Sequence, residues 1–106
     1  MGFFDNMKAN KLGQKAYNAH VQGNELTKRG KKADAAAKYA EAIELYEQAY
    51  DEGCRKTGML MSYSVLMLRT GLFAEARELM KEIGQKYITE NGADYAKGLS
   101  GVIIMG

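Results

Sequence analysis

The sequence predicts an all-α protein made of antiparallel helical hairpins, and three observations support this fold class. None of the 106 residues is proline, the residue that most strongly interrupts a helix. Apolar residues recur at steps of three and four along most of the chain, which is the spacing of one face of an α-helix. Gly30, Gly53 and Gly71 separate these periodic stretches, as glycines at helix ends do. We therefore expect about five helices.

The composition narrows the classes of protein to which the chain can belong. Hydrophobic residues make up 46% and charged residues 26%, which is ordinary for a soluble globular domain. The sequence shows neither an apolar run long enough to cross a bilayer nor a secretory signal at its N-terminus. Cys54 is the single cysteine and cannot form an internal disulfide, as expected in a reducing compartment. These observations predict a cytoplasmic protein without a membrane partner.

Residues 1–13 are predicted to form an N-terminal extension to a domain that spans residues 14–106. Phe3, Phe4 and Met7 would either fray or pack on that domain. Alternatively, these apolar residues form a weak anchor at a membrane surface together with Lys8 and Lys11. The pattern is too short to favour the membrane.

The first predicted hairpin consists of two helices, over residues 14–29 and 33–52. Gly30 ends the first of these helices, where a left-handed glycine is a common cap. Small and large residues alternate on the predicted buried face of the second helix, so a neighbouring helix can approach closely at the alanines. That face consists of Ala35, Tyr39, Ala42, Ile43, Tyr46, Ala49 and Tyr50.

The second hairpin is predicted over residues 57–83, followed by a last helix over residues 94–105. The first half of this hairpin is apolar on nearly every side, which is typical of a helix buried between neighbours. Its second half is amphipathic. The apolar residues are Met59, Leu60, Met61, Tyr63, Val65, Leu66, Met67 and Leu68 in the first half, and Leu72, Phe73, Ala76, Leu79, Met80 and Ile83 in the second.

Charge alternates along the chain, although the formal net charge is only +2. Residues 1–32 carry seven basic against two acidic residues, a net of +5, and residues 33–53 carry one basic against six acidic residues, a net of −5. We expect the solvated faces of adjacent helices to attract one another weakly, with each exposed pair worth about 0 to 1 kcal/mol.

The two hairpins share a pattern that indicates an internal repeat. When Gly30 is aligned with Gly71, a small residue stands seven positions earlier, an alanine five positions later, and a large residue four positions beyond that. The matched pairs are Gly23 and Ser64, Ala35 and Ala76, and Tyr39 and Met80. This pattern resembles the tetratricopeptide repeat, in which the small residue lets two helices cross closely while the alanine and the large residue lock them together.

The resemblance implies a short right-handed α-solenoid. Repeat one would span about residues 16–53, repeat two about residues 57–90, and residues 94–105 would be the first helix of a third repeat. The spacing from Gly30 to Gly71 is 41 residues, against about 34 in the family. The excess corresponds to about two helical turns, so we expect a lengthened second helix in repeat one.

The resemblance also implies a non-catalytic scaffold for protein–protein interaction. In this family the first helix of each repeat lines a concave groove that binds a peptide or a partner protein. The positions carried over are Tyr17, His20, Asn24, Thr27 and Lys28 in repeat one, Met61, Val65, Leu68 and Arg69 in repeat two, and Tyr95, Val102 and Met105 beyond them. An apolar surface with a basic edge suits an amphipathic or acidic partner segment.

Two alternatives remain open at this point. The chain could be a regulatory or substrate-binding domain of a larger assembly, whose basic cluster at residues 28–32 contacts an acidic partner or nucleic acid. Nucleic acid is the less favoured partner because no aromatic platform accompanies the cluster. The long second helix is also similar to that of a three-helix trafficking-type domain that binds short helical peptides.

His20 and Cys54 are the two residues that could carry chemistry. A single imidazole without a second histidine or a nearby cysteine does not make a metal site. A nucleophile and base would need a third, orienting group, and none accompanies the pair. We expect neither catalysis, nor a metal, nor a cofactor.

The apolar C-terminal residues 102–105 would need cover from another element. Either the sequence is part of a longer repeat protein or a second copy covers this helix in a homo-oligomer. The residues predicted to mediate self-association are Leu99, Ile103 and Ile104.

Overall fold

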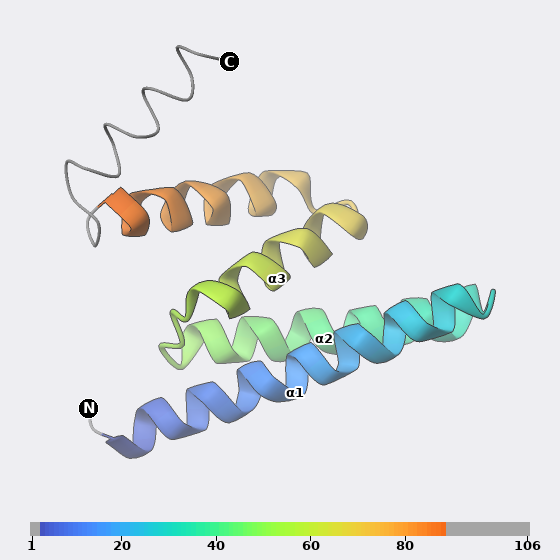
Figure 1. Cartoon of the computed structure of the whole chain (residues 1–106), viewed down its shortest axis with the longest axis horizontal. Coiled ribbons are helices and arrows are strands. Elements are labelled where there is room, and N and C mark those ends of the chain that lie inside the picture. Colours follow the sequence, from blue (N-terminus) through green and yellow to red (C-terminus); the bar gives the residue numbers. More distant parts are fainter. Residues whose placement is uncertain (1–2, 89–106) are drawn as a thin grey trace, which may run out of the picture.

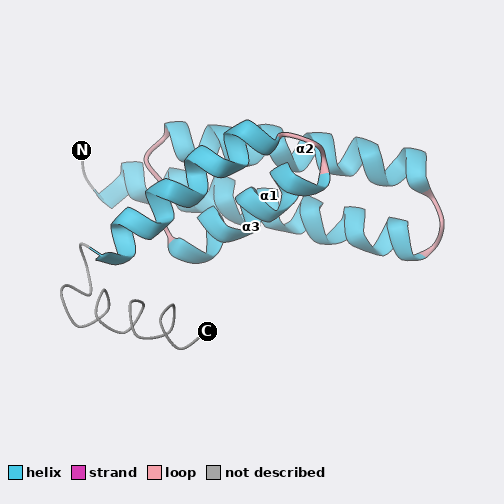
Figure 2. Cartoon of the chain, turned by 90° about the horizontal axis from the view of Figure 1, so that it is seen from above, coloured by secondary structure: helices cyan, strands magenta, loops and turns pink. Residues whose placement is uncertain are grey.

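The computed structural model describes the backbone of residues 3–88 and the side chains of residues 7–88. These residues form four helices and no strand, which confirms the all-α class (Figures 1 and 2). The helices are α1 (Phe3–Lys28), α2 (Lys32–Asp51), α3 (Thr57–Arg69) and a fourth helix over residues 73–88, drawn in orange in Figure 1. Outside the described residues lie the predicted fifth helix, its self-association residues Leu99, Ile103 and Ile104, and the positions Tyr95, Val102 and Met105.

Each of the three loops contains a glycine with positive φ, which has no Cβ to clash in this conformation. The φ angles are +76° at Gly30, +102° at Gly53 and +87° at Gly71. The Gly30 N–H donates to the Thr27 carbonyl at 3.0 Å and the next N–H to the Leu26 carbonyl at 2.9 Å, and the other two loops repeat this pattern. These bonds satisfy carbonyl groups at the end of each helix, so the chain can turn back sharply.

Helix α1 begins at Phe3, so the prediction that the first helix starts near residue 14 is wrong. Ala9 and Ala16 are both buried on one face, which shows that the described part of the predicted extension continues the helix. Gly13 lies within this helix, and its lack of a side chain lets α3 pack closely against α1. A Cβ added at Gly13 would lie 3.2 Å from Met59 Cγ, so α3 approaches α1 at this point.

Helix α2 packs antiparallel to α1 and buries the alternating face that the sequence predicts. The ring of Tyr39 lies against Gly23, and near the other end of the hairpin Lys8 Nζ lies 3.3 Å from Glu52 Oε1. The buried residues of α2 are Ala35, Tyr39, Ala42, Tyr46 and Ala49, while Ile43 and Tyr50 are half-buried. Small residues on both helices therefore let the two backbones approach, as expected.

Helix α3 runs parallel to α1, because Met59 near its start meets Gly13 and Arg69 at its end bonds Asn24. It lies between the first hairpin and the fourth helix (Figure 1). The expectation that α3 is buried on nearly every side is wrong for one stripe. Its buried residues are Met59, Leu60, Tyr63, Ser64, Leu66 and Met67, whereas Met61, Val65 and Leu68 are exposed.

The fourth helix packs through Ala76 and Leu79, which are both buried. Met80, which the repeat pattern pairs with Tyr39, is 42% exposed and is not wedged beneath α3. Successive residues in a helix are rotated by about 100°, so a helix that buries residue 79 carries residue 80 away from the core. The alanine position of the repeat is therefore buried in both hairpins, and the large position only in the first.

Candidate functional site

Five apolar residues of α1 and α3 are exposed, and we call them together the α1–α3 face. They are Tyr17 and Val21 on α1 and Met61, Val65 and Leu68 on α3. On α3 they recur at steps of four and three, so they form one stripe along the helix. Met61 and Val65 keep 51% and 50% of their surface exposed. Val21 was not among the predicted groove residues, although its spacing of four from Tyr17 could have identified it.

A cavity of about 350 Å³ lies between α1 and the start of α3, at one end of this face. The Cys54 thiol is buried beside it and donates a hydrogen bond to Asn10 Oδ1 at 3.6 Å. The residues that line the cavity are Asn10, Gly13, Gln14, Tyr17, Cys54, Lys56, Gly58, Met59 and Ser62. Its wall is mixed, with amide, thiol and hydroxyl groups beside one methionine.

A polar network ties α1, α2 and α3 together at the other end of the face. The Tyr39 hydroxyl donates to Asn24 Oδ1 at 2.7 Å. Arg69 Nη1 donates to the same Asn24 oxygen at 2.9 Å and to the Tyr39 hydroxyl at 3.0 Å. Thr27 Oγ1 lies 3.2 Å from that hydroxyl and donates to the Gly23 carbonyl at 3.0 Å. The structure thus brings three predicted groove residues together around Tyr39, which the sequence marked only as a core residue.

Lys28 lies apart from this network. Its ammonium is 3.4 Å from Glu25 Oε1 in an exposed pair one helical turn apart. Such a pair contributes little to stability. The basic edge of the α1–α3 face is therefore formed by Arg69, which is held by α1 and α2, and by Lys28, whose side chain is largely in solvent.

His20 lies beneath the α1–α3 face, with only 6% of its surface exposed. Its Nδ1 is 2.9 Å from the Tyr46 hydroxyl, and the rings of Tyr17, Tyr39 and Tyr46 surround the imidazole edge-on, with centroids 6.0 to 6.4 Å away. Burial, and secondarily the charge of Arg69, lowers the pKa of His20 because both disfavour the imidazolium. The structure therefore places this predicted groove residue in the packing between α1 and α2.

Two tyrosines continue this core toward α3. The rings of Tyr46 and Tyr63 stack with centroids 5.2 Å apart and planes 18° apart. Burial raises the pKa of each phenol to about 12, so both stay protonated at neutral pH. A layer of stacked tyrosine rings thus lies between α2 and α3.

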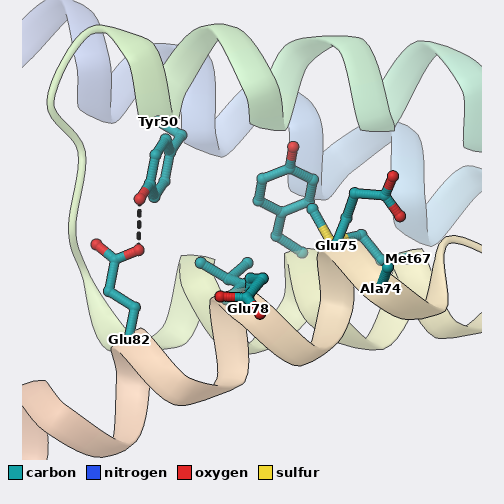
Figure 3. Close-up of a pocket in the computed structure, with 8 residues that line it drawn as sticks. Tyr50, Met67, Ala74, Glu75, Glu78 and Glu82 are labelled. Carbon is teal, nitrogen blue, oxygen red and sulfur yellow. Dashed lines mark hydrogen bonds between the residues drawn. The ribbon is translucent and has the colours of Figure 1, made fainter.

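A second hollow, which we call the acidic cleft, lies between α2, α3 and the fourth helix (Figure 3). Its volume is about 500 Å³. Apolar side chains and tyrosine rings form its wall, and three glutamates of the fourth helix stand on its rim. The residues that line it are Tyr50, Tyr63, Met67, Ala74, Glu75, Glu78, Leu79 and Glu82. The sequence reasoning missed this cleft, although glutamates at spacings of three and four mark one stripe of the fourth helix.

One end of the acidic cleft is closed by interactions of Glu82. This carboxylate accepts hydrogen bonds from the Tyr50 hydroxyl and from Arg55 Nε, the latter at 3.2 Å. The Arg55 guanidinium also lies over the Tyr50 ring, 3.5 Å from its centroid. The hydrogen bond to Glu82 is the main cause of the raised pKa of Tyr50. A cation at this end is therefore held by an aromatic face and a carboxylate together.

Within residues 3–88, neither hollow contains a group of three or more His, Cys, Asp or Glu side chains arranged to hold a metal ion. The hydrogen-bond partner of Cys54 is Asn10, and that of His20 is Tyr46. Across the same part of the chain, no helix combines the length and apolarity needed to cross a membrane.

We compared the chain with protein-family models, with curated proteins and with solved structures, and none of the three comparisons found a significant match.

Proposed function

We propose that this protein is a non-catalytic, repeat-like interaction module that binds an amphipathic or acidic segment of a partner protein across the α1–α3 face. The observation that carries the proposal is the exposure of five apolar side chains on two parallel helices. An apolar patch of this kind on a folded domain is commonly an interaction site.

The order of the helices supports the repeat-like description. α1 and α3 run in the same direction, and Tyr50 of α2 meets Glu82 of the fourth helix. We infer that the two hairpins stack as in a tetratricopeptide-like solenoid, with the first helix of each pair forming the binding face. The predicted cytoplasmic location and homo-oligomer remain predictions.

The packing beneath the face favours tight binding for its size. Arg69 and the Tyr39 hydroxyl hold the ends of α1 and α3, and the stack of Tyr46 on Tyr63 fills the layer below. A preformed face loses little conformational entropy when a partner binds. Met61 can adapt its flexible side chain to partners of different shape.

The charges at the edge favour a partner segment that carries carboxylates at one end. Arg69 and Lys28 both lie at the C-terminal ends of their helices, next to the exposed apolar stripes. A helical segment with apolar residues at steps of three and four and an acidic end would match this face.

The test compares two double variants with the same change in charge. Met61→Lys with Val65→Lys puts two lysines on the face, whereas Ala36→Lys with Ala40→Lys puts two lysines at the same spacing on exposed positions of α2. We expect partners captured from the native cell by the unaltered protein to be lost with the first variant and retained with the second. Partners retained by the first variant, or lost equally with both, would contradict the proposal.

A further inference from the structure

We infer that the acidic cleft is a second interaction site, which binds an amphipathic helix bearing lysine or arginine from a partner protein. This inference does not depend on the α1–α3 face, because the cleft is lined by α2, α3 and the fourth helix.

The acidic cleft combines an apolar wall with a rim of carboxylates. Met67, Leu79 and the ring of Tyr63 contribute apolar wall, and the space of about 500 Å³ is large enough for one or two aliphatic side chains. Figure 3 shows Glu75, Glu78 and Glu82 following one another along the fourth helix at the edge of this space. An apolar hollow bordered by carboxylates suits a ligand that is apolar in the middle and cationic at its border.

Part of the negative charge near the cleft has no ion-pair partner among residues 7–88, whose side chains the structure describes. Glu75 forms no ion pair with any residue from 7 to 88, whereas Glu82 pairs with Arg55, and Glu78 pairs with the exposed Lys81 at 3.5 Å. Glu47 and Asp51 of α2 likewise form no ion pair within this range. After burial, the charges of Glu47, Asp51 and Glu75 are further causes of the raised pKa of Tyr63, so the cleft beside this tyrosine favours a cation.

The protein already holds one cation, the Arg55 guanidinium, at the end of the cleft. Arg55 lies over the Tyr50 ring and donates to Glu82, which combines an aromatic face with a carboxylate. Tyr63 and Glu75 line the same cleft and offer the same two kinds of group without an internal arginine. A lysine or arginine of a partner can repeat this interaction there.

These groups favour a basic peptide over a metal ion. The structure contains no metal-binding group of three or more His, Cys, Asp or Glu in residues 3–88, and the rim carboxylates are separated along the helix. An ion alone would also leave the apolar wall uncovered. A peptide that presents leucines and lysines on adjoining faces would use both features.

The experiment measures binding of a fluorescent synthetic 16-residue helix, with leucines on one face and lysines on the other, to the full chain. The variant is Glu75→Gln with Glu78→Gln, which removes two rim charges and leaves Glu82 to hold Tyr50 and Arg55. The control is Glu25→Gln with Glu41→Gln, which removes two carboxylates from exposed ion pairs elsewhere. All three proteins should melt at similar temperatures.

We expect the cleft variant to bind the peptide about tenfold more weakly, and the control to bind it within about twofold of the unaltered protein. Raising the salt concentration should weaken binding to the unaltered protein, since the rim charges are in contact with solvent. A matched peptide with glutamate in place of lysine should not bind. Met61→Lys with Val65→Lys should leave binding of the lysine peptide intact, which separates this site from the α1–α3 face.

Three outcomes would overturn the inference. The first is that the unaltered protein fails to bind the lysine peptide at millimolar concentration. The second is an equal loss of affinity in the cleft variant and the control variant, which would mean that the peptide is attracted to the net charge of the protein and not to the cleft. The third is self-association of the unaltered protein that disappears in the cleft variant, because the occupant would then be a second copy. Sedimentation at several protein concentrations distinguishes this last case.

Discussion

The two hairpins follow one pattern in sequence but close in different ways. Ala35 and Ala76 occupy matched positions and are both buried. Their neighbours four residues on differ, because Tyr39 is 8% exposed and Met80 is 42% exposed. The first hairpin is therefore closed by an aromatic wedge, and the second by Ala76 and Leu79.

The Tyr39 side chain fills space between α1 and α2, and its hydroxyl also links α2 to α1 and α3 through hydrogen bonds. Tyr39 bonds Asn24 of α1 and accepts a hydrogen bond from Arg69 of α3. Its ring also requires a glycine opposite, since a Cβ at Gly23 would lie 2.5 Å from Tyr39 Cε1. At the matched position, the hydroxyl of Ser64 donates to the Leu60 carbonyl of its own helix at 2.8 Å. Both hairpins thus have a small residue at the matched position. Only in the first hairpin does a large residue pack against it and hydrogen-bond to neighbouring helices.

The largest expected effect tests this difference directly. Tyr39→Ala should lower the free energy of unfolding by about 3 to 5 kcal/mol, because it leaves a cavity between α1 and α2 and removes the hydroxyl from Asn24 and Arg69. Met80→Ala should change it by about 0.5 kcal/mol or less, as usual for an exposed position. Urea unfolding followed by circular dichroism measures both values. Equal losses would mean that the two hairpins close in the same way.

The next effect concerns the close contact at Gly23. Gly23→Ala should destabilise the protein by about 1 to 3 kcal/mol through the clash with the Tyr39 ring, reduced by the gain in helix propensity of about 1 kcal/mol. Gly84→Ala is the matched control, because Gly84 is helical and a Cβ there meets no atom of the described residues within 4 Å. That change should stabilise the protein by up to about 1 kcal/mol. A stabilising Gly23→Ala in the same thermal melts would show that the ring moves aside.

The smallest effect is a pH dependence that belongs to the first hairpin. The pKa of His20 is lowered in the folded state, so the unfolded chain binds more protons as the pH falls through the ordinary histidine value of about 6.5. The contribution of His20 to stability is therefore complete above that value and is lost progressively below it. Between about pH 7.5 and 5.5, the melting temperature should fall more for the unaltered protein than for His20→Gln. A steeper fall for His20→Gln would show that the folded state favours the imidazolium.

Much of the fold follows from local patterns. The all-α class and the boundaries of α2 within one residue were predicted, and so were the glycine turns and the buried stripe of α2. The beginning of α1 was not predicted, because the apolar residues before residue 14 stand among polar ones, and their spacing does not show whether they pack on the domain. The burial of Ala9 and the contact of Met59 with Gly13 show that they belong to a packed helix.

The candidate sites were predicted less completely. The stripe of Met61, Val65 and Leu68 is exposed at the positions carried over from the repeat pattern, but His20 lies beneath the face. The acidic cleft needed tertiary structure, since its lining comes from three helices and no single stretch contains it. The net charge of −5 over residues 33–53 indicates that α2 is acidic. It does not show that Glu75 and Glu78 of the fourth helix line a cleft beside α2.

Local patterns specify which segments are helical and where the chain turns, because helical periodicity and left-handed glycines act through neighbouring residues. Packing between the helices sets how each helix is rotated about its own axis, and hence that Leu79 is buried and Met80 is exposed. An amphipathic helix carries apolar residues on several neighbouring stripes of its surface. Their spacing in the sequence does not show which of these stripes is buried. Contact with neighbouring helices buries one of these stripes and leaves the others exposed, as on α3.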